Sequence, residues 1–108
     1  MGQLRREGAR WRYSETVSAD TVSAPLLLPE MDEPRPATVA VHPAAGATGR
    51  IEYTLAPRAD VEAGLATVKW LTWPVGDTTI PAADVIEGPA TAVRCVATGG
   101  SVDWEVLA

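Results

Sequence analysis

The side chains that could do chemistry in this sequence are few, beginning with its single histidine and its single cysteine. His42 could accept a proton or bind a metal, and Cys95 could act as a nucleophile. His42 comes just before Pro43 at the end of an expected strand, a position typical of surface histidines. Cys95 falls in the inward row of another expected strand, where a thiol packs as a small apolar group. A zinc site would need two carboxylates beside these residues, and no spacing suggests them.

Two groups of carboxylates are the next candidates. Asp103 and Glu105 alternate with apolar residues, which predicts a solvated sheet face rather than an acid–base pair. Glu30, Asp32 and Glu33 stand between prolines and could attract Ca²⁺, but the segment lacks the glycine and the spaced oxygens of a calcium loop. The sequence also contains no P-loop, GxGxxG or GxSxG motif. We therefore expect a protein without catalytic activity, cofactor or metal.

Two tryptophans three residues apart form the most distinctive aromatic feature. An exposed pair made of Trp70 and Trp73 could stack on sugar rings. A chain without phenylalanine, however, needs tryptophan in its core, which favours packing inside the domain or between subunits. Trp70 and Trp73 are therefore candidate partner-binding residues, with carbohydrate binding as the alternative function.

Four arginines near the start of the chain are the other candidate partner-binding residues. Arg5, Arg6, Arg10 and Arg12 stand with one glutamate in residues 1–12, a net charge of +3 that leaves −8 for the rest of a chain whose total is −5. An acidic body repels phosphate, which argues against nucleic acid. We expect this basic segment to dock onto an acidic protein neighbour or an adjacent copy.

Short alternating runs separated by turn signals predict the elements that position these residues. Such runs occur at 10–19, 21–28, 38–42, 49–55, 65–73 and on both sides of Gly99-Gly100. The Gly-Gly pair predicts a two-residue hairpin at the end of the chain, and 38–55 predicts a second hairpin. One turn of helix is expected within 56–64, and an irregular segment over 78–89, where two prolines limit pairing.

These elements predict an all-β fold, either an antiparallel β-sandwich or a small jelly-roll-like barrel of about six to seven strands. We expect residues 1–10 to be an extended, flexible basic arm and residues 11–108 to form one domain. The core is rich in alanine and valine and therefore small, which suggests stabilisation by association into a homo-oligomer. No apolar run is long enough to span a membrane, and the first residues lack the apolar region of a signal peptide.

The second half of the chain resembles a known class of proteins. GRIEYTLAPRADVEAGLATVKWLTWPVG, beginning at Gly49, and GPATAVRCVATGGSVDWEVLA, beginning at Gly88, are similar to small structural proteins from the virion modules of tailed bacteriophages and prophages. The likeness lies in the order of features: a strand ending in Tyr-Thr-Leu, an Ala-Gly loop, a strand with two tryptophans and a Gly-Pro-x-Thr-Ala segment. It covers about half of the chain.

The resemblance implies a non-enzymatic β-rich subunit that decorates the capsid or sits in the neck, tail or a fibre. Proteins of this class are commonly symmetric oligomers, and a trimer is favoured. Their partners are capsid or tail proteins and their own copies. They are made in the cytoplasm of the bacterial host and end up in the virion.

Overall fold

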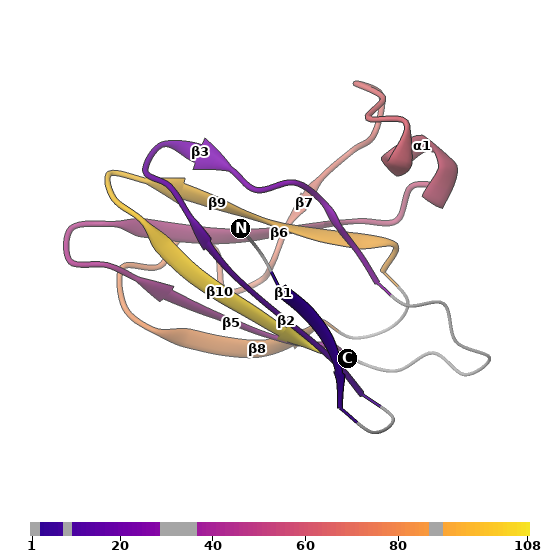
Figure 1. Ribbon diagram of the computed structural model, residues 1–108. Helices are drawn as coiled ribbons and strands as arrows, with labels where there is room; N and C mark the ends of the chain where they lie inside the picture. The colour runs from indigo at the N-terminus through magenta and orange to yellow at the C-terminus, as the bar shows by residue number, and fades with distance from the viewer. Residues whose placement is uncertain (1–2, 8–9, 29–36, 87–89) are drawn as a thin grey trace.

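Two antiparallel sheets packed face to face make up most of the chain in the computed structural model, which describes residues 3–7, 10–28, 37–86 and 90–108 (Figure 1). The first sheet has the order β1–β2–β10–β5–β8, with β1 Gln3–Glu7, β2 Arg10–Val17, β10 Val102–Leu107, β5 Ala37–Pro43 and β8 Ala82–Ile86. The second has the order β3–β9–β6–β7, with β3 Thr21–Val22, β9 Ala92–Thr98, β6 Thr48–Thr54 and β7 Leu71–Thr72. A further strand, β4 Leu26–Leu27, also pairs with β9.

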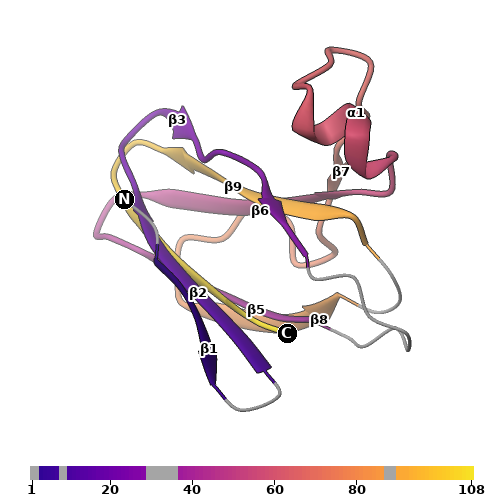
Figure 2. The ribbon, with the colours of Figure 1, turned by 45° about the vertical axis from the view of Figure 1, so that its right-hand side comes forward.

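The predicted antiparallel sandwich is confirmed. Among the described residues, seven strands are five residues or longer, namely β1, β2, β5, β6, β8, β9 and β10, and three strands contain two residues each. The helical turn predicted within 56–64 is α1 (Arg58–Glu62). Figure 2 shows the two sheets as separate layers, with α1 outside the second sheet.

The two predicted hairpins are wrong in their pairing. Strand β9 pairs with β6, β3 and β4, whereas the next strand, β10, pairs with β2 and β5. Gly99-Gly100 therefore carries the chain from one sheet to the other, and the turn between β5 and β6 does the same. We call each of these connections an arch, because it joins two strands that lie in opposite sheets. Each strand has one apolar row, and an arch lets two successive rows face each other across the core as effectively as a hairpin lets them lie side by side.

The two arches pack against each other at one end of the sandwich. A Cβ atom on Gly100 would lie 2.9 Å from the Cβ of Ala47, and one on Gly99 would lie 3.1 Å from the carbonyl oxygen of Gly46. The backbone N–H of Gly99 also donates to Oδ1 of Asp20 over 2.9 Å. Asp20 itself has a φ of 57°, a left-handed conformation that aspartate tolerates better than most residues. Close packing at this end therefore depends on small residues and on one side-chain acceptor.

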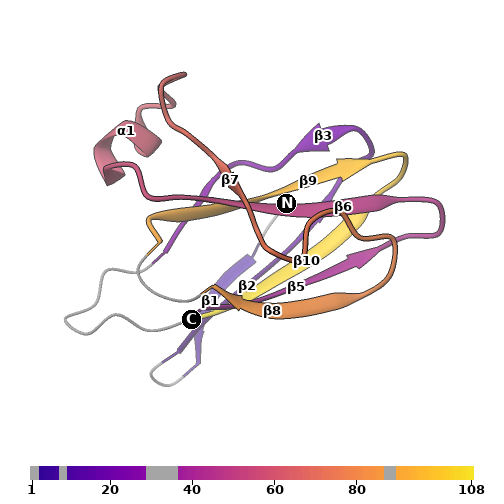
Figure 3. The ribbon, with the colours of Figure 1, turned by 180° about the vertical axis from the view of Figure 1, so that it is seen from behind.

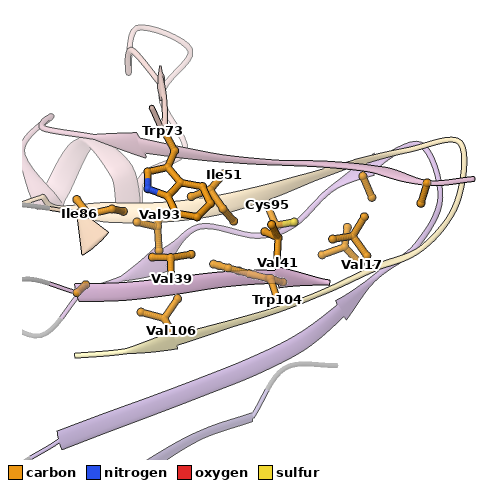
Figure 4. Close-up of a cluster of buried hydrophobic side chains, with 14 residues drawn as sticks. Val17, Val39, Val41, Ile51, Trp73, Ile86, Val93, Cys95, Trp104 and Val106 are labelled. Carbon is orange, nitrogen blue, oxygen red and sulfur yellow. The ribbon is translucent and has the colours of Figure 1, made fainter. Parts of the chain in front are cut away.

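The core lies between the sheets; valine is its commonest residue, and two tryptophans are its largest members (Figure 4). The ring of Tyr13 meets that of Trp104 edge-on, with 5.5 Å between centroids and 64° between planes. The alternating runs predicted for β5, β9 and β10 each have one buried row, and the members of these rows are Val39, Val41, Val93, Cys95, Ala97, Val102, Trp104 and Val106.

The start of the chain differs from the flexible arm expected over 1–10. Gln3–Glu7 forms strand β1, which pairs with β2 in the register Gln3↔Ser14 to Glu7↔Arg10. The charge pattern of this segment predicted a flexible arm, but charged side chains are also common on edge strands. Pairing with β1 gives the backbone groups along the outer side of β2 their partners.

Two further segments also differ from expectation. The strand predicted over 65–73 is only β7, two residues long, and the segment before it is irregular. The segment predicted to be irregular over 78–89 contains β8, which pairs with β5. Pro81 comes just before β8, where a missing N–H does not interrupt the pairing. Figure 3 shows β7 and β8 on the same side of the sandwich, joined by the segment between them.

Candidate functional site

The single thiol is part of the core. Cys95 is fully buried on β9, and burial, followed by the charge of Glu15, raises the pKa of its thiol to about 12. A nucleophilic cysteine needs a lowered pKa and access to solvent, and Cys95 has neither. The prediction that Cys95 packs as a small apolar residue is confirmed.

A carboxylate also reaches toward the space between the sheets. The indole Nε1–H of Trp104 donates to Oε1 of Glu15 over 3.1 Å. Burial first, and then the charge and hydrogen bond of Glu15, raise the pKa of the Tyr13 hydroxyl to about 12. Glu15 is thereby engaged by two core aromatic residues. We infer that it supports the packing of the first sheet rather than taking part in acid–base chemistry.

The described outer face of the first sheet is a polar surface whose side chains are joined by hydrogen bonds and ion pairs. His42 Nε2 lies 3.0 Å from Glu105 Oε1, and Arg12 Nη1 lies 3.7 Å from Glu105 Oε2. The Thr16 hydroxyl donates to Oδ1 of Asp103 over 2.6 Å. His42 is exposed at the strand end, as predicted, and Asp103 and Glu105 lie on the solvated face, as predicted.

No three histidine, cysteine or acidic side chains converge to hold a metal within the part of the chain that the structure describes. Glu30, Asp32 and Glu33, considered above as a calcium site, lie outside the described residues.

The four arginines predicted to bind a partner all fall on the β1–β2 hairpin of the first sheet. The backbone register places Arg5 opposite Arg12 and places Arg6 and Arg10 in the same pair of strands. Arg12 is ion-paired with Glu105, whereas the side chains of Arg5, Arg6 and Arg10 lie outside the description.

The two tryptophans named as candidate partner-binding residues lie on opposite faces of the second sheet, and the core packing favoured for them is found for Trp73. Trp73 points into the core and is only 1% exposed (Figure 4). Trp70 is half-buried and contacts Arg94, which belongs to the row of β9 opposite to the buried Val93 and Cys95. The structure therefore does not bring Trp70 and Trp73 together into one exposed aromatic surface.

A cluster that the sequence did not reveal surrounds Trp70 on the outer face of the second sheet. The guanidinium carbon of Arg94 lies 4.2 Å from the centroid of the Trp70 ring, a stacked cation–π contact. Arg94 Nη2 lies 2.7 Å from Oε1 of Glu52, its direct neighbour on β6. Arg50 Nε lies 3.2 Å from the other oxygen of Glu52, and Arg50 Nη1 lies 3.4 Å from Asp77. One largely buried carboxylate thus serves two guanidinium groups.

A cavity of about 430 Å³ opens beside this cluster. Its walls are Pro25, Val61, Gly64, Leu65, Ala66, Val68, Trp70 and Arg94. The wall formed by residues 64–70 is fastened to the sheet, because the Thr54 hydroxyl donates to the carbonyl oxygen of Lys69 over 2.8 Å. Arg58 Nη1 fastens α1 in the same way, by donating to the carbonyl oxygen of Leu28 over 3.1 Å. We call this hollow the Trp70 cavity.

The side of the sandwich formed by Leu71–Ile86 carries exposed apolar side chains. Leu71 on β7 is 45% exposed, Val85 on β8 is 38% exposed, and Ile80 between the two strands is 68% exposed. We call this region the β7–β8 side; Figure 3, turned by 180° from Figure 1, shows the course of its backbone.

The strand edge on the β7–β8 side is partly closed by an aspartate. Ala44 N donates to Ser101 O, so even-numbered residues of β5 face β10 and odd-numbered ones face β8. Val85 pairs with Thr38 and must therefore turn its N–H to the free edge. Oδ1 of Asp84 accepts that N–H over 2.7 Å. The β7–β8 side thus offers apolar side chains more readily than backbone donors.

Comparison of the sequence with protein-family models and with curated proteins, and of the fold with solved structures, finds no match. In the described ranges, no helix has the length and apolar character needed to cross a membrane.

Proposed function

We propose that this chain is a non-enzymatic structural subunit of a phage particle that packs against its own copies and against other virion proteins. The observation that carries the proposal is the apolar β7–β8 side. Leu71, Ile80 and Val85 expose apolar side chains on this side of the domain, and apolar side chains are common in surfaces that contact another protein. The virion setting rests on the resemblance of residues 49–108 to virion structural proteins.

Two other features support assembly. The core contains many valine and alanine side chains, each of which buries little area, so contact between subunits would add buried apolar area. The β1–β2 hairpin concentrates arginine, whereas the rest of the chain is acidic. Opposite charges on one molecule favour head-to-tail contact between copies or docking onto an acidic neighbour.

Carbohydrate binding, the alternative function, required Trp70 and Trp73 to form an exposed pair, and the structure does not contain such a pair. A sugar platform needs aromatic faces open to solvent, and Trp73 is enclosed in the core. Trp70 already has the guanidinium of Arg94 against its ring. Assembly is therefore the better-supported function.

The oligomeric state of the purified chain tests the proposal. We expect sedimentation velocity and native mass spectrometry to show a closed oligomer, with a trimer favoured. Ile80→Asp should shift the population toward monomer, because it places a charge in the contact while leaving an exposed position exposed. Val22→Asp is the matched control, since Val22 is 49% exposed on β3, at the opposite edge of the second sheet.

Two results would contradict this proposal. One is a purified chain that stays monomeric at every protein concentration tested, including concentrations as high as those within a virus particle. The other is equal dissociation by Ile80→Asp and Val22→Asp, which would remove the β7–β8 side from the contact. The virion setting has its own test: mass spectrometry of purified phage particles from the source strain should detect this chain in them.

A further inference from the structure

Strand β1 forms one margin of the first sheet, and among the described residues only β2 pairs with it (Figure 2). The register extends from Gln3↔Ser14 to Glu7↔Arg10, along the whole of β1. The other side of β1 faces away from the sheet. A strand with one unpaired side presents a row of backbone donors and acceptors to which another strand can bind.

The hydrogen bonds of β2 determine which residues of β1 face outward. Trp11 and Ala108 exchange two backbone hydrogen bonds, of 2.7 and 2.9 Å. The odd-numbered residues of β2 therefore turn their N–H and C=O groups to β10, and the even-numbered ones turn them to β1. Arg5 pairs with one of these even-numbered residues, so its backbone groups face β2. The backbone groups of Leu4 and Arg6 consequently face the free edge.

The two edges of the first sheet differ in how readily they accept another strand. At β8, Oδ1 of Asp84 accepts the outward N–H of Val85, and Pro81 stands directly before the strand. Residues 3–7 contain neither proline nor aspartate, so β1 lacks both of these devices. The open edge of the first sheet is therefore the outer side of β1.

The charge of the β1–β2 hairpin selects the kind of strand that can add at this edge. Against its four arginines the hairpin carries Glu7 and Glu15, and Glu105 of β10 pairs with Arg12. Arginines outnumber these carboxylates even when all three are counted. Opposite charges on neighbouring strands stabilise their pairing, whereas like charges destabilise it. An added strand should therefore be acidic.

A second copy of the chain fits this edge poorly. Antiparallel pairing of two β1 strands through Leu4 and Arg6 would place Arg5 directly opposite its own counterpart, with like charges facing each other. The β8 edge of another copy is closed by Asp84. The other strands of the described chain that lie outside the sheet centres, β3, β4 and β7, contain two residues each. The occupant should therefore belong to a different protein.

We propose that the outer edge of β1 receives an extended acidic segment of another protein, which adds to the first sheet as a further strand. The backbone groups of Leu4 and Arg6 would bond to this segment, and its carboxylates would lie beside the arginine-rich hairpin. Main-chain bonds supply affinity in this mode of recognition, and side chains supply specificity. The inference rests on the assembly function proposed above and assigns β1 to the contact with other virion proteins.

An acidic peptide, acetyl-Thr-Glu-Val-Glu-Val-Glu-Thr-amide, tests the edge, because its valines and threonines favour an extended chain. We expect its titration into the ¹⁵N-labelled protein to shift the backbone amide signals of Leu4 and Arg6 and to slow their hydrogen exchange. The amide of Arg5, which already faces β2, should exchange as before. The dissociation constant should be on the order of 1 mM. The basic analogue, with lysine in place of glutamate, should bind about fivefold more weakly at low salt.

Proline substitutions locate the binding at one strand edge. Leu4→Pro removes an outward N–H without removing a bond between β1 and β2, and it should weaken binding of the acidic peptide about fivefold. Val85→Pro is the matched control, because it removes an outward N–H at the β8 edge and should leave the binding unchanged. A protected amide at Arg5 in both variants would show that β1 is still paired with β2.

Three results would each overturn the proposal: no change at Leu4 and Arg6, equal binding of the acidic and the basic peptide, or undiminished binding by Leu4→Pro. The comparison of the two peptides on the wild-type protein stays decisive even if Leu4→Pro detaches β1. A dimer in which Leu4 and Arg6 are protected without any peptide would also overturn it, because a second copy would then occupy the edge.

The peptide titration and the oligomeric state are separate measurements. A monomeric chain that binds the acidic peptide as expected would count against the homo-oligomer and leave the β1 edge as a binding site. An oligomer that dissociates with Ile80→Asp but does not bind the peptide would support the assembly function and overturn the strand addition.

Discussion

Replacement of the buried thiol should change how stability depends on pH. The Cys95 thiol has a pKa of about 12 in the folded protein, against 9.0 for an unperturbed thiol. The folded state therefore holds this proton more tightly than the unfolded state. The stabilisation is fully present below about pH 9 and is lost as the pH rises from there toward 12.

The magnitude follows from these two pKa values. At about pH 10 an unfolded chain has mostly ionised this thiol, whereas the folded chain has not, and the difference lowers the free energy of unfolding by about 1.4 kcal/mol relative to pH 7. Cys95→Ala removes the titrating group and leaves a small cavity, which costs about 1 kcal/mol at both pH values. The cavity cost cancels when the two pH values are compared.

Urea denaturation followed by tryptophan fluorescence provides the measurement. We expect the wild-type protein to lose about 1.4 kcal/mol more than Cys95→Ala between pH 7 and about pH 10. Tyr13, whose pKa is also raised, contributes equally to both proteins and cancels. The same loss in both proteins would refute the placement of the thiol in a water-free core, and so would rapid reaction of the native protein with a thiol reagent at neutral pH.

Three further substitutions examine the turns and the sheet edge. Gly100→Ala should lower the free energy of unfolding by about 1–3 kcal/mol, because its Cβ would lie 2.9 Å from the neighbouring arch; an unchanged urea midpoint would contradict that packing. Asp20→Ala should be about 1 kcal/mol less stable than Asp20→Asn, because asparagine keeps an acceptor for the N–H of Gly99 and tolerates a φ of 57°; equal midpoints would argue against this bond. Asp84→Ala should increase self-association in sedimentation velocity, because it frees the N–H of Val85 at a strand edge; an unchanged distribution would show that Asp84 does not guard the edge.

The inward rows of the sheets could be predicted from the sequence, but the pairing of strands could not. Val39 and Val41 on β5, like Val102 and Val106 on β10, alternate with outward residues, and a period of two is the signature of a strand with one buried face. That period is the same whether the next strand joins the same sheet or the opposite one. A glycine pair such as Gly99-Gly100 is compatible with a hairpin and with an arch, so the sequence predicted a hairpin at a place where the structure has an arch.

The candidate site was hidden for a related reason. Trp70 and Arg94 are far apart in sequence, and their contact depends on the path of residues 55–70 across the outer face of the second sheet. The alternating run over 65–73 predicted a strand, but most of it is a loop, whose carbonyl oxygen at Lys69 accepts a hydrogen bond from Thr54 of the second sheet. Cys95 was placed correctly because its burial depends only on its position within one strand.

The position of β10 has a consequence for how the protein is made. Strand β10 lies at the centre of the first sheet, between β2 and β5, yet it follows both of them in the sequence. Until residues 102–107 have been synthesised and released, neither β2 nor β5 can form its native pairing with β10. Strand β10 must then insert between β2 and β5. Because its pairing with β2 joins residues far apart in sequence, this step should be slower than the formation of a sheet from successive hairpins. During that interval the nascent chain is at its most vulnerable to pairing with the wrong strand, including one from another copy.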